Sequence, residues 1–215
     1  MNISYALGMS LTLEALLHQP QQVRVVYYAS SLKRDEAFLK LEYLCKQYDI
    51  PFINDDHLIN KLSVKENCYA VAEIEVIKKE LATKQHLLFH GATDAGTLGT
   101  CLRCAISFNF KDIVLIDCLP LTDTKLIRAS MGAFFQCNFN EFKTLIDYQN
   151  EYLKQQLFLF KQEANLPQSK KDEAYTLIFD FQNELNIDDC FGINMDNEIS
   201  LAQSCAIICH HLYIR

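Results

Sequence analysis

The chain lacks a long apolar run, a basic N-terminal stretch and an excess of cationic residues. It has no 18 consecutive apolar residues, so we expect no membrane span. Residues 1–5 (MNISY) lack the basic stretch of a secretory signal, so we expect a cytoplasmic protein. Half of the 215 residues are hydrophobic and 22% are charged, which is typical of a globular protein. This composition excludes collagen-like, coiled-coil and disordered chains.

The charge is acidic throughout, with a net value of −7. Residues 1–80 hold 9 Lys and Arg against 11 Asp and Glu, and residues 81–215 hold 11 against 16. Phosphate contacts need clustered Lys and Arg. Any nucleic-acid surface must therefore be a local patch.

The nine cysteines do not form the pattern of a disulfide scaffold. Their number is odd and no secretory signal precedes them, so we interpret them as reduced thiols used as small apolar residues. We expect no metal, because the lone Cys101-x-x-Cys104 pair cannot complete a zinc site. Near the C-terminus, helical spacing and apolar neighbours favour helix packing over metal binding by Cys205, Cys209, His210 and His211.

Residues 1–80 alternate between strand and helix patterns, which predicts a small α/β sandwich with a partly parallel sheet. The charged stretch 75–85 lacks Pro and Gly and is interpreted as a helical linker. We therefore expect two domains, 1–80 and 81–215. The strands expected in the first domain are 23–28, 51–53 and 69–74, and the helices are 11–17, 35–48 and 55–62.

Residues 86–215 repeat the alternation and predict a second α/β domain. Stretches rich in Leu, Ile, Val and Phe predict strands at 87–89, 113–116, 157–160 and 177–181. Helices are expected at 97–108, 122–131, 139–153 and 199–213.

Residues 90–103 (HGATDAGTLGTCLR) run from an expected strand through a turn into a helix. Gly91 and Gly96 allow tight backbone geometry, and the helix N-terminus favours anionic groups. The spacing is neither a Walker loop nor a dinucleotide-binding G-x-G-x-x-G. By itself the segment is more typical of an ordinary strand-to-helix turn than of a ligand site.

A second segment, together with this turn, matches the sequence patterns of a known family. Residues 94–105 (DAGTLGTCLRCA) and 127–135 (IRASMGAFF) resemble the patterns D-P-G-N-x-G-T-x-x-R-T-A and V-[RK]-A-S-x-G-A-x-F. These patterns belong to the SpoU-type (TrmH-like) RNA ribose methyltransferases of the SPOUT superfamily. The resemblance extends in order over nearly the whole chain, including 8–16 (GMSLTLEAL), 49–52 (DIPF), 113–117 (IVLID) and 198–206 (EISLAQSCA).

The resemblance implies a fold and a reaction. The fold would be an L30e-like α/β/α sandwich that binds RNA, followed by a SPOUT α/β domain with a C-terminal trefoil knot. Relatives are usually homodimers that hold S-adenosylmethionine in the knot. The implied function in RNA processing is transfer of a methyl group from that cofactor to a ribose 2′-hydroxyl of tRNA or rRNA.

The resemblance also assigns site residues. Arg103 matches the catalytic arginine, and a guanidinium, which carries only donors, is a poor proton acceptor. We expect it to bind phosphate and stabilise the developing alkoxide, the alternative being a surface salt bridge. Arg128 would contact the RNA backbone, the alternative being a solvated cation. The cofactor would lie against Ile193, Met195, Ser200 and Leu201.

Several chemistry positions depart from the family pattern. Thr97 and Ala202 stand where the family has Asn, and residues 180–185 (DFQNEL) replace a glycine-rich cofactor loop, with Gln182 in place of Glu. Two hypotheses follow: an active methyltransferase with a divergent cofactor loop, or a catalytically degenerate SPOUT-fold module for RNA binding or dimerisation. An unrelated α/β enzyme that binds a phosphate at turn 91–100 is a weaker third hypothesis, because motifs match in both halves.

Overall fold

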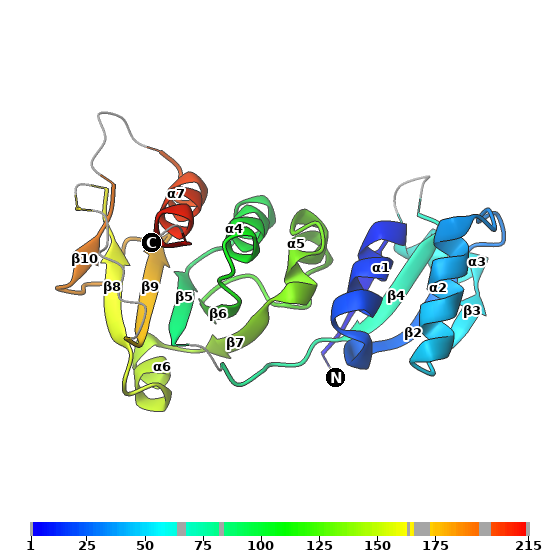
Figure 1. The fold of residues 1–215 in the computed structure, drawn as a ribbon, viewed down its shortest axis with the longest axis horizontal. Coiled ribbons are helices and arrows are strands. Elements are labelled where there is room, and N and C mark those ends of the chain that lie inside the picture. Colours follow the sequence, from blue (N-terminus) through cyan, green and yellow to red (C-terminus); the bar gives the residue numbers. More distant parts are fainter. Residues whose placement is uncertain are drawn as a thin grey trace. The chain divides into compact units, whose positions relative to one another are not determined.

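The computed structural model describes residues 2–63, 68–81, 84–162, 164–165, 173–193 and 199–213. The chain forms two compact α/β units (Figure 1). One comprises Met1–Ile77 and Pro120–Gln136, and the other comprises Lys78–Leu119 and Cys137–Arg215. The chain thus leaves the first unit close to the expected boundary at 80, and residues 120–136 return to it.

The first unit holds a four-stranded mixed sheet in the order β1-β4-β2-β3. Strands β2 and β3 are parallel and the other neighbours are antiparallel, so the predicted partly parallel sheet is confirmed. The strands are β1 (Ile3–Leu7), β2 (Val23–Tyr28), β3 (Phe52–Asn54) and β4 (Ala70–Glu75). The helices are α1 (Met9–His18), η1 (Pro20–Gln22), α2 (Glu36–Gln47), α3 (Asp56–Leu62), α5 (Thr124–Ala129) and η2 (Ala133–Gln136).

Aspartates begin the helices of this unit where the sequence predicts them. The Asp35 carboxylate accepts hydrogen bonds from the backbone of Ala37 and Phe38 at the start of α2. The Asp55 carboxylate accepts one from Leu58 at the start of α3. Such caps satisfy amide groups that have no partner inside the helix.

The second unit holds a six-stranded parallel sheet in the order β10-β8-β9-β5-β6-β7. Every residue of β9 and β6 is buried, as is typical of strands covered on both faces. Helices α4 and α7 lie side by side on one face (Figure 1). The strands are β5 (Gln85–His90), β6 (Asp112–Ile116), β7 (Asn138–Phe142), β8 (Gln156–Phe160), β9 (Tyr175–Asp180) and β10 (Cys190–Phe191), and the helices are α4 (Ala95–Ser107), α6 (Leu145–Glu151) and α7 (Leu201–Tyr213).

Two sequence-based predictions about elements are wrong. The expected helix 139–153 begins as strand β7, which pairs with β6, and only then becomes α6. A capping box between Thr144 and Asp147 starts that helix. The expected helical linker is not helical over residues 76–81, where the Lys79 amide donates a hydrogen bond to the Phe139 carbonyl at 2.8 Å. Pairing with distant backbone therefore outweighs the local helix propensity there.

The C-terminal segment doubles back across the sheet. After β9 the chain passes β8 to form β10, and α7 then packs on α4. The Lys161 amide donates to the Phe191 carbonyl at 2.7 Å, and the Gly192 amide donates to the Asn165 carbonyl at 2.9 Å. A Cβ atom on Gly192 would overlap the Lys161 carbonyl, so the backbones need glycine to approach this closely. The predicted knot depends partly on residues outside the described ranges and stays a prediction.

Candidate functional site

A pocket of about 530 Å³ lies at the C-terminal ends of β8 and β9 and the start of α7. Its volume falls within the usual range for small-molecule sites. The carboxyl ends of parallel strands are also where α/β proteins usually bind ligands. The pocket is lined by Phe160, Lys161, Gln162, Asp180, Phe181, Asn183, Ile199 and Leu201.

Aromatic packing holds the strand ends of this pocket in place. The Phe160 ring stacks on Phe179 with centroids 5.6 Å apart and meets Phe191 edge-on at 5.6 Å. Phe181 packs against Phe89 at 6.4 Å. Because interlocked aromatic rings leave little freedom at these strand ends, the pocket wall is preorganised.

Polar contacts hold the part of the pocket wall formed by Ile199 and Leu201. The Gln162 side-chain amide donates to the Ile199 carbonyl at 3.1 Å. The Ser200 hydroxyl accepts from the Gln203 amide at 3.3 Å, while the Gln203 side chain accepts from the Ser200 amide at 2.9 Å. This reciprocal capping starts α7 and fixes Leu201, its first residue, at the pocket.

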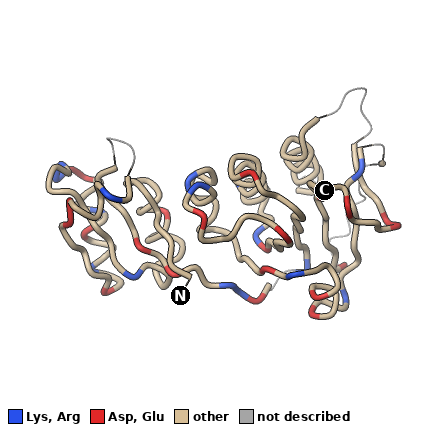
Figure 2. The backbone as a smooth tube through the Cα atoms, turned by 180° about the vertical axis from the view of Figure 1, so that it is seen from behind, with Lys and Arg blue, Asp and Glu red and all other residues tan. Residues whose placement is uncertain are grey.

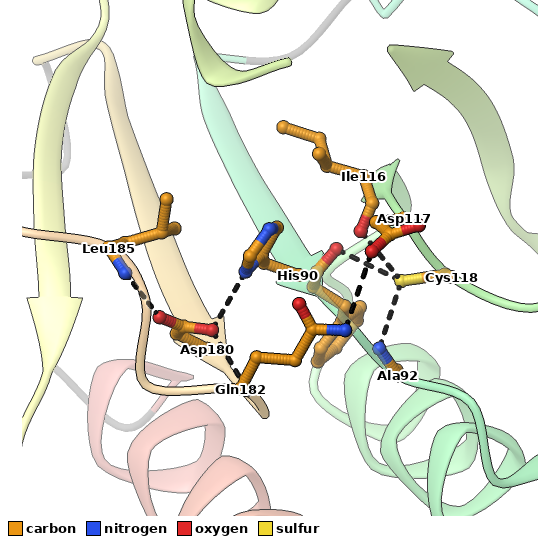
Figure 3. A network of polar contacts seen from close by, with 9 residues as sticks. His90, Ala92, Ile116, Asp117, Cys118, Asp180, Gln182 and Leu185 are labelled. Atoms are coloured by element: carbon orange, nitrogen blue, oxygen red, sulfur yellow. Dashed lines mark hydrogen bonds and ion pairs between the residues drawn. The ribbon is translucent and has the colours of Figure 1, made fainter. Parts of the chain in front are cut away.

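The Asp180 carboxylate joins β9, β5 and the following loop (Figure 3). One oxygen lies 2.8 Å from His90 Nδ1 and accepts from the Gln182 amide at 3.0 Å, and the other accepts from the Leu185 amide at 2.7 Å. Burial acts to raise the pKa of Asp180, but the hydrogen bonds from His90, Leu185 and Gln182 outweigh it and the pKa is lowered. The carboxylate is therefore ionised at neutral pH.

The Asp180 side chain changes what the loop 180–185 offers to a ligand. The amides of Gln182 and Leu185 are already satisfied by its carboxylate. The Gln182 side chain lies over Gly91, where an added Cβ would meet it, and its amide reaches Asp117 at 3.4 Å (Figure 3). Side chains on this loop therefore hinder close approach of a ligand to its backbone, although the pocket beside it stays open.

The turn between β5 and α4 is held by a second aspartate. Asp94 accepts hydrogen bonds from both the amide and the hydroxyl of Thr97, each at 2.7 Å. These two bonds lower the pKa of Asp94. Thr97, which replaces the family asparagine, therefore serves here as part of a helix cap.

Arg103 lies on the exposed side of α4. Its guanidinium forms no ion pair within the described part of the chain, so the alternative of a surface salt bridge finds no partner there. The opposite side of the helix is buried and carries Leu98, Cys101, Leu102 and Ala105. Helix packing thus leaves the Arg103 side chain in solvent.

Buried thiols lie where α4 and α7 pack together. Cys205 Sγ lies 3.9 Å from Cys209 Sγ. A hydrogen bond with Cys205 and burial raise the pKa of Cys101 well above its usual range. The Cys101 thiol therefore stays protonated, and the buried thiols pack as small apolar groups. Over the described ranges, no three His, Cys, Asp or Glu side chains are grouped so that they could hold a metal ion.

The structure brings together only some of the predicted site residues. Leu201 lines the pocket, Ser200 precedes it, and half-buried Ile193 follows β10. Met195 lies outside the described residues. Arg128 is exposed on α5, which belongs to the first unit, whereas Arg103 belongs to the second.

Sequence reasoning missed most of the polar pocket wall. Lys161 and Gln162 match no motif used above, whereas Asn183 lies in the divergent cofactor loop 180–185. Their positions could have indicated the site, because all three lie one or two residues after the predicted strands 157–160 and 177–181. Such strand ends lie at the same edge of a parallel sheet, where ligands usually bind.

Residues 84–185 match the SpoU rRNA Methylase family. The match covers slightly less than half of the chain. The matched range begins at β5 and ends in the loop that follows Asp180, so it contains the Asp94 turn, Arg103 and most of the pocket wall. A comparison with curated protein sequences gives no match.

Solved structures share the fold of the whole chain. The SpoU methyltransferase AviRb from Streptomyces viridochromogenes is 14% identical with a TM-score of 0.80, over 99% of this chain and 89% of that one. The structure of AviRb in complex with the cofactor AdoMet is 14% identical with a TM-score of 0.77, over 99% of this chain and 90% of that one. An rRNA methyltransferase from Sinorhizobium meliloti is 14% identical with a TM-score of 0.80, over 98% of this chain and 86% of that one. At these identities the likeness establishes the SpoU methyltransferase fold.

None of the helices that the structure describes has the length and hydrophobicity needed to cross a membrane. Figure 2 shows cationic and anionic residues interspersed along both units of the described chain. This distribution agrees with the expectation that any nucleic-acid surface is a local patch.

Proposed function

We propose that the chain is an S-adenosylmethionine-dependent RNA 2′-O-methyltransferase. The observation that carries the proposal is the pocket at the C-terminal edge of a SpoU domain. Its volume suits a nucleoside-sized ligand, and its apolar lining residues (Phe160, Phe181, Ile199 and Leu201) offer surfaces for an adenine ring. The residues present therefore fit the cofactor.

The bound cofactor would supply a methyl group on a sulfonium. In the reaction the carbon–sulfur bond breaks, a carbon–oxygen bond forms at the ribose 2′ position, and the hydroxyl proton leaves to solvent. Arg103 would hold an RNA phosphate and stabilise the negative charge that develops on that oxygen. Its guanidinium is exposed and has no ion-pair partner among the described residues, which is consistent with this role.

The partners follow from the same assignment. We propose tRNA or rRNA as substrate, with Arg128 contacting its backbone and residues 1–80 acting as an L30e-like RNA-binding domain. Ile193, Met195, Ser200 and Leu201 would surround the cofactor within a knotted C-terminal segment. A homodimer in the cytoplasm completes the proposal.

A second candidate is a catalytically degenerate module that binds RNA or dimerises. Two observations favour it. The Asp180 carboxylate occupies the loop amides of Gln182 and Leu185, and the Thr97 hydroxyl is bound to Asp94. Both features remove hydrogen-bonding groups that a ligand would otherwise use.

Calorimetric titration of the full chain with S-adenosylmethionine separates the two candidates. The enzyme requires a dissociation constant below about 100 µM, or roughly 5.5 kcal/mol of binding free energy. Leu201→Glu in the pocket should abolish this binding, whereas Ile207→Glu, on a 41% exposed position of the same helix, should preserve it. RNA binding without any heat from the cofactor would favour the module.

A further inference from the structure

Asp180 places a negative charge in the wall of the pocket. Its side chain is only 4% exposed, and the one other charged lining residue in the described part of the chain is Lys161. Lys161 is exposed to solvent. Because water and salt screen a buried charge less than an exposed one, the Asp180 charge acts on the pocket more strongly than the Lys161 charge does.

We propose that Asp180 makes the pocket select a cationic sulfonium cofactor over its neutral thioether product. The inference rests on the proposed function. S-adenosylmethionine and S-adenosylhomocysteine share the adenosine and the amino-acid tail, and they differ by one methyl group and the positive charge on sulfur. Attraction to Asp180 therefore adds to the affinity for the cofactor alone, and it disappears once the methyl group has left.

The hydrogen bonds around the carboxylate keep its charge in place. His90 Nδ1 and the amides of Gln182 and Leu185 all contact it. These contacts hold the pKa of Asp180 below its ordinary value despite burial.

A purely structural role makes a different prediction. If Asp180 only held the loop 180–185 in shape, its loss would weaken both ligands by the same factor. A charge effect instead changes the ratio of the two affinities. The ratio therefore separates selection by charge from support of the loop.

The test is calorimetric titration of the full chain with each ligand at low salt and pH 8, where a histidine is ordinarily neutral. The wild-type chain should bind S-adenosylmethionine more tightly than S-adenosylhomocysteine. Asp180→Asn should reduce that preference about tenfold, the order of effect that one unit charge has across a ligand pocket. Asp180→Glu, which keeps the charge but changes the geometry, should retain the preference.

Lys161→Gln supplies a control of opposite sign. Removing this positive charge should increase the preference for S-adenosylmethionine, by less than the Asp180 effect because Lys161 is exposed. Opposite shifts from the two variants would support a through-space charge effect.

An unchanged ratio in Asp180→Asn, with S-adenosylhomocysteine still bound, would overturn the proposal. So would a wild-type chain that binds the thioether more tightly, which needs no variant and decides the matter even where Asp180→Asn does not fold. A wild-type chain that binds neither ligand would overturn the proposed function as well. Binding of S-adenosylmethionine with the wrong ratio would leave the proposed function standing.

Discussion

At the scale of single residues, two aspartates at the C-terminal edge of the second sheet have different structural roles. Asp94 caps α4 and holds the Thr97 hydroxyl, which sets the geometry of the turn. Asp180 connects His90 to the loop beside the pocket. The turn is therefore fixed by Asp94, which the family pattern shares, together with Thr97, which replaces the family asparagine, and Arg103 is presented from a well-defined helix.

Replacing Arg103 tests its role in the proposed reaction. Arg103→Ala should lower the rate of RNA methylation by about 100-fold or more, because it removes a donor to the developing alkoxide. Arg103→Lys keeps the charge without the planar fork and should recover only part of the rate. Both variants should melt like the parent, because the side chain is exposed. Methylation by Arg103→Ala at the parental rate would exclude this role.

The lowered pKa of Asp180 predicts a pH-dependent contribution to stability. A carboxyl whose pKa is lower in the folded state stabilises the fold fully above its unfolded pKa of about 3.9. That contribution is lost as the pH falls through the folded-state pKa. The difference in unfolding free energy between the parent and Asp180→Asn should therefore be constant near neutral pH and shrink below about pH 4.

Urea denaturation of both proteins from pH 7 down to pH 3 measures this difference. Glu184→Gln, at an exposed position of the same loop, should stay close to the parent throughout. A difference for Asp180→Asn that does not change with pH would show that the carboxylate contributes no proton-linked stability.

At the scale of elements, α6 is anchored to the sheet by a buried polar chain. The Tyr148 hydroxyl lies 2.8 Å from His86 Nδ1 and 2.5 Å from Thr176 Oγ1, and the Thr176 hydroxyl donates to Gln155 at 3.1 Å. Tyr148 is fully buried, and burial raises its pKa. The hydroxyl is therefore protonated and connects a short helix to β5 and β9.

Tyr148→Phe should destabilise the fold by about 1–3 kcal/mol, because it takes a hydrogen-bond partner from two buried groups. Ile146→Ala, at a 67% exposed position of the same helix, should change stability by less than about 0.5 kcal/mol. Denaturant unfolding followed by circular dichroism measures both. Equal effects from the two variants would contradict the anchoring role.

Elements with a strong local signal could be predicted from sequence. Helices α2 and α3, each capped by an aspartate, and the apolar strands β2, β5, β6 and β9 lie close to the predicted ranges. Strand β10 has two residues and β1 alternates only small and half-buried side chains, so neither has a distinctive pattern. The extended stretch 76–81 depends on the backbone of Asn2 and Phe139, which no local window contains.

At the scale of the whole molecule, the resemblance predicted the SpoU fold, whereas the division into units required the structure. Residues 120–136 join the first unit through contacts such as the Ser4 hydroxyl donating to the Thr122 carbonyl at 2.7 Å. Gly132 packs closely against the Glu14 side chain in the same unit. Contacts separated by more than 100 residues leave no pattern in a single sequence.

The candidate site shows the same division. Leu201 and Ser200 could be named because they match a family motif, and the departures at Thr97 and Asp180 were visible from the same alignment. The consequences of those departures depend on three dimensions. Only the structure shows that Asp180 meets His90 and that the pocket beside them remains open.

The most direct test of the account is methyl transfer itself. The full chain is incubated with S-adenosylmethionine labelled in its methyl group and with total RNA from cells in which the gene has been deleted. The account predicts label in RNA, recovered after alkaline hydrolysis in dinucleotides that a 2′-O-methyl group protects from cleavage. Label confined to a base, or none in RNA while the cofactor binds, would contradict it.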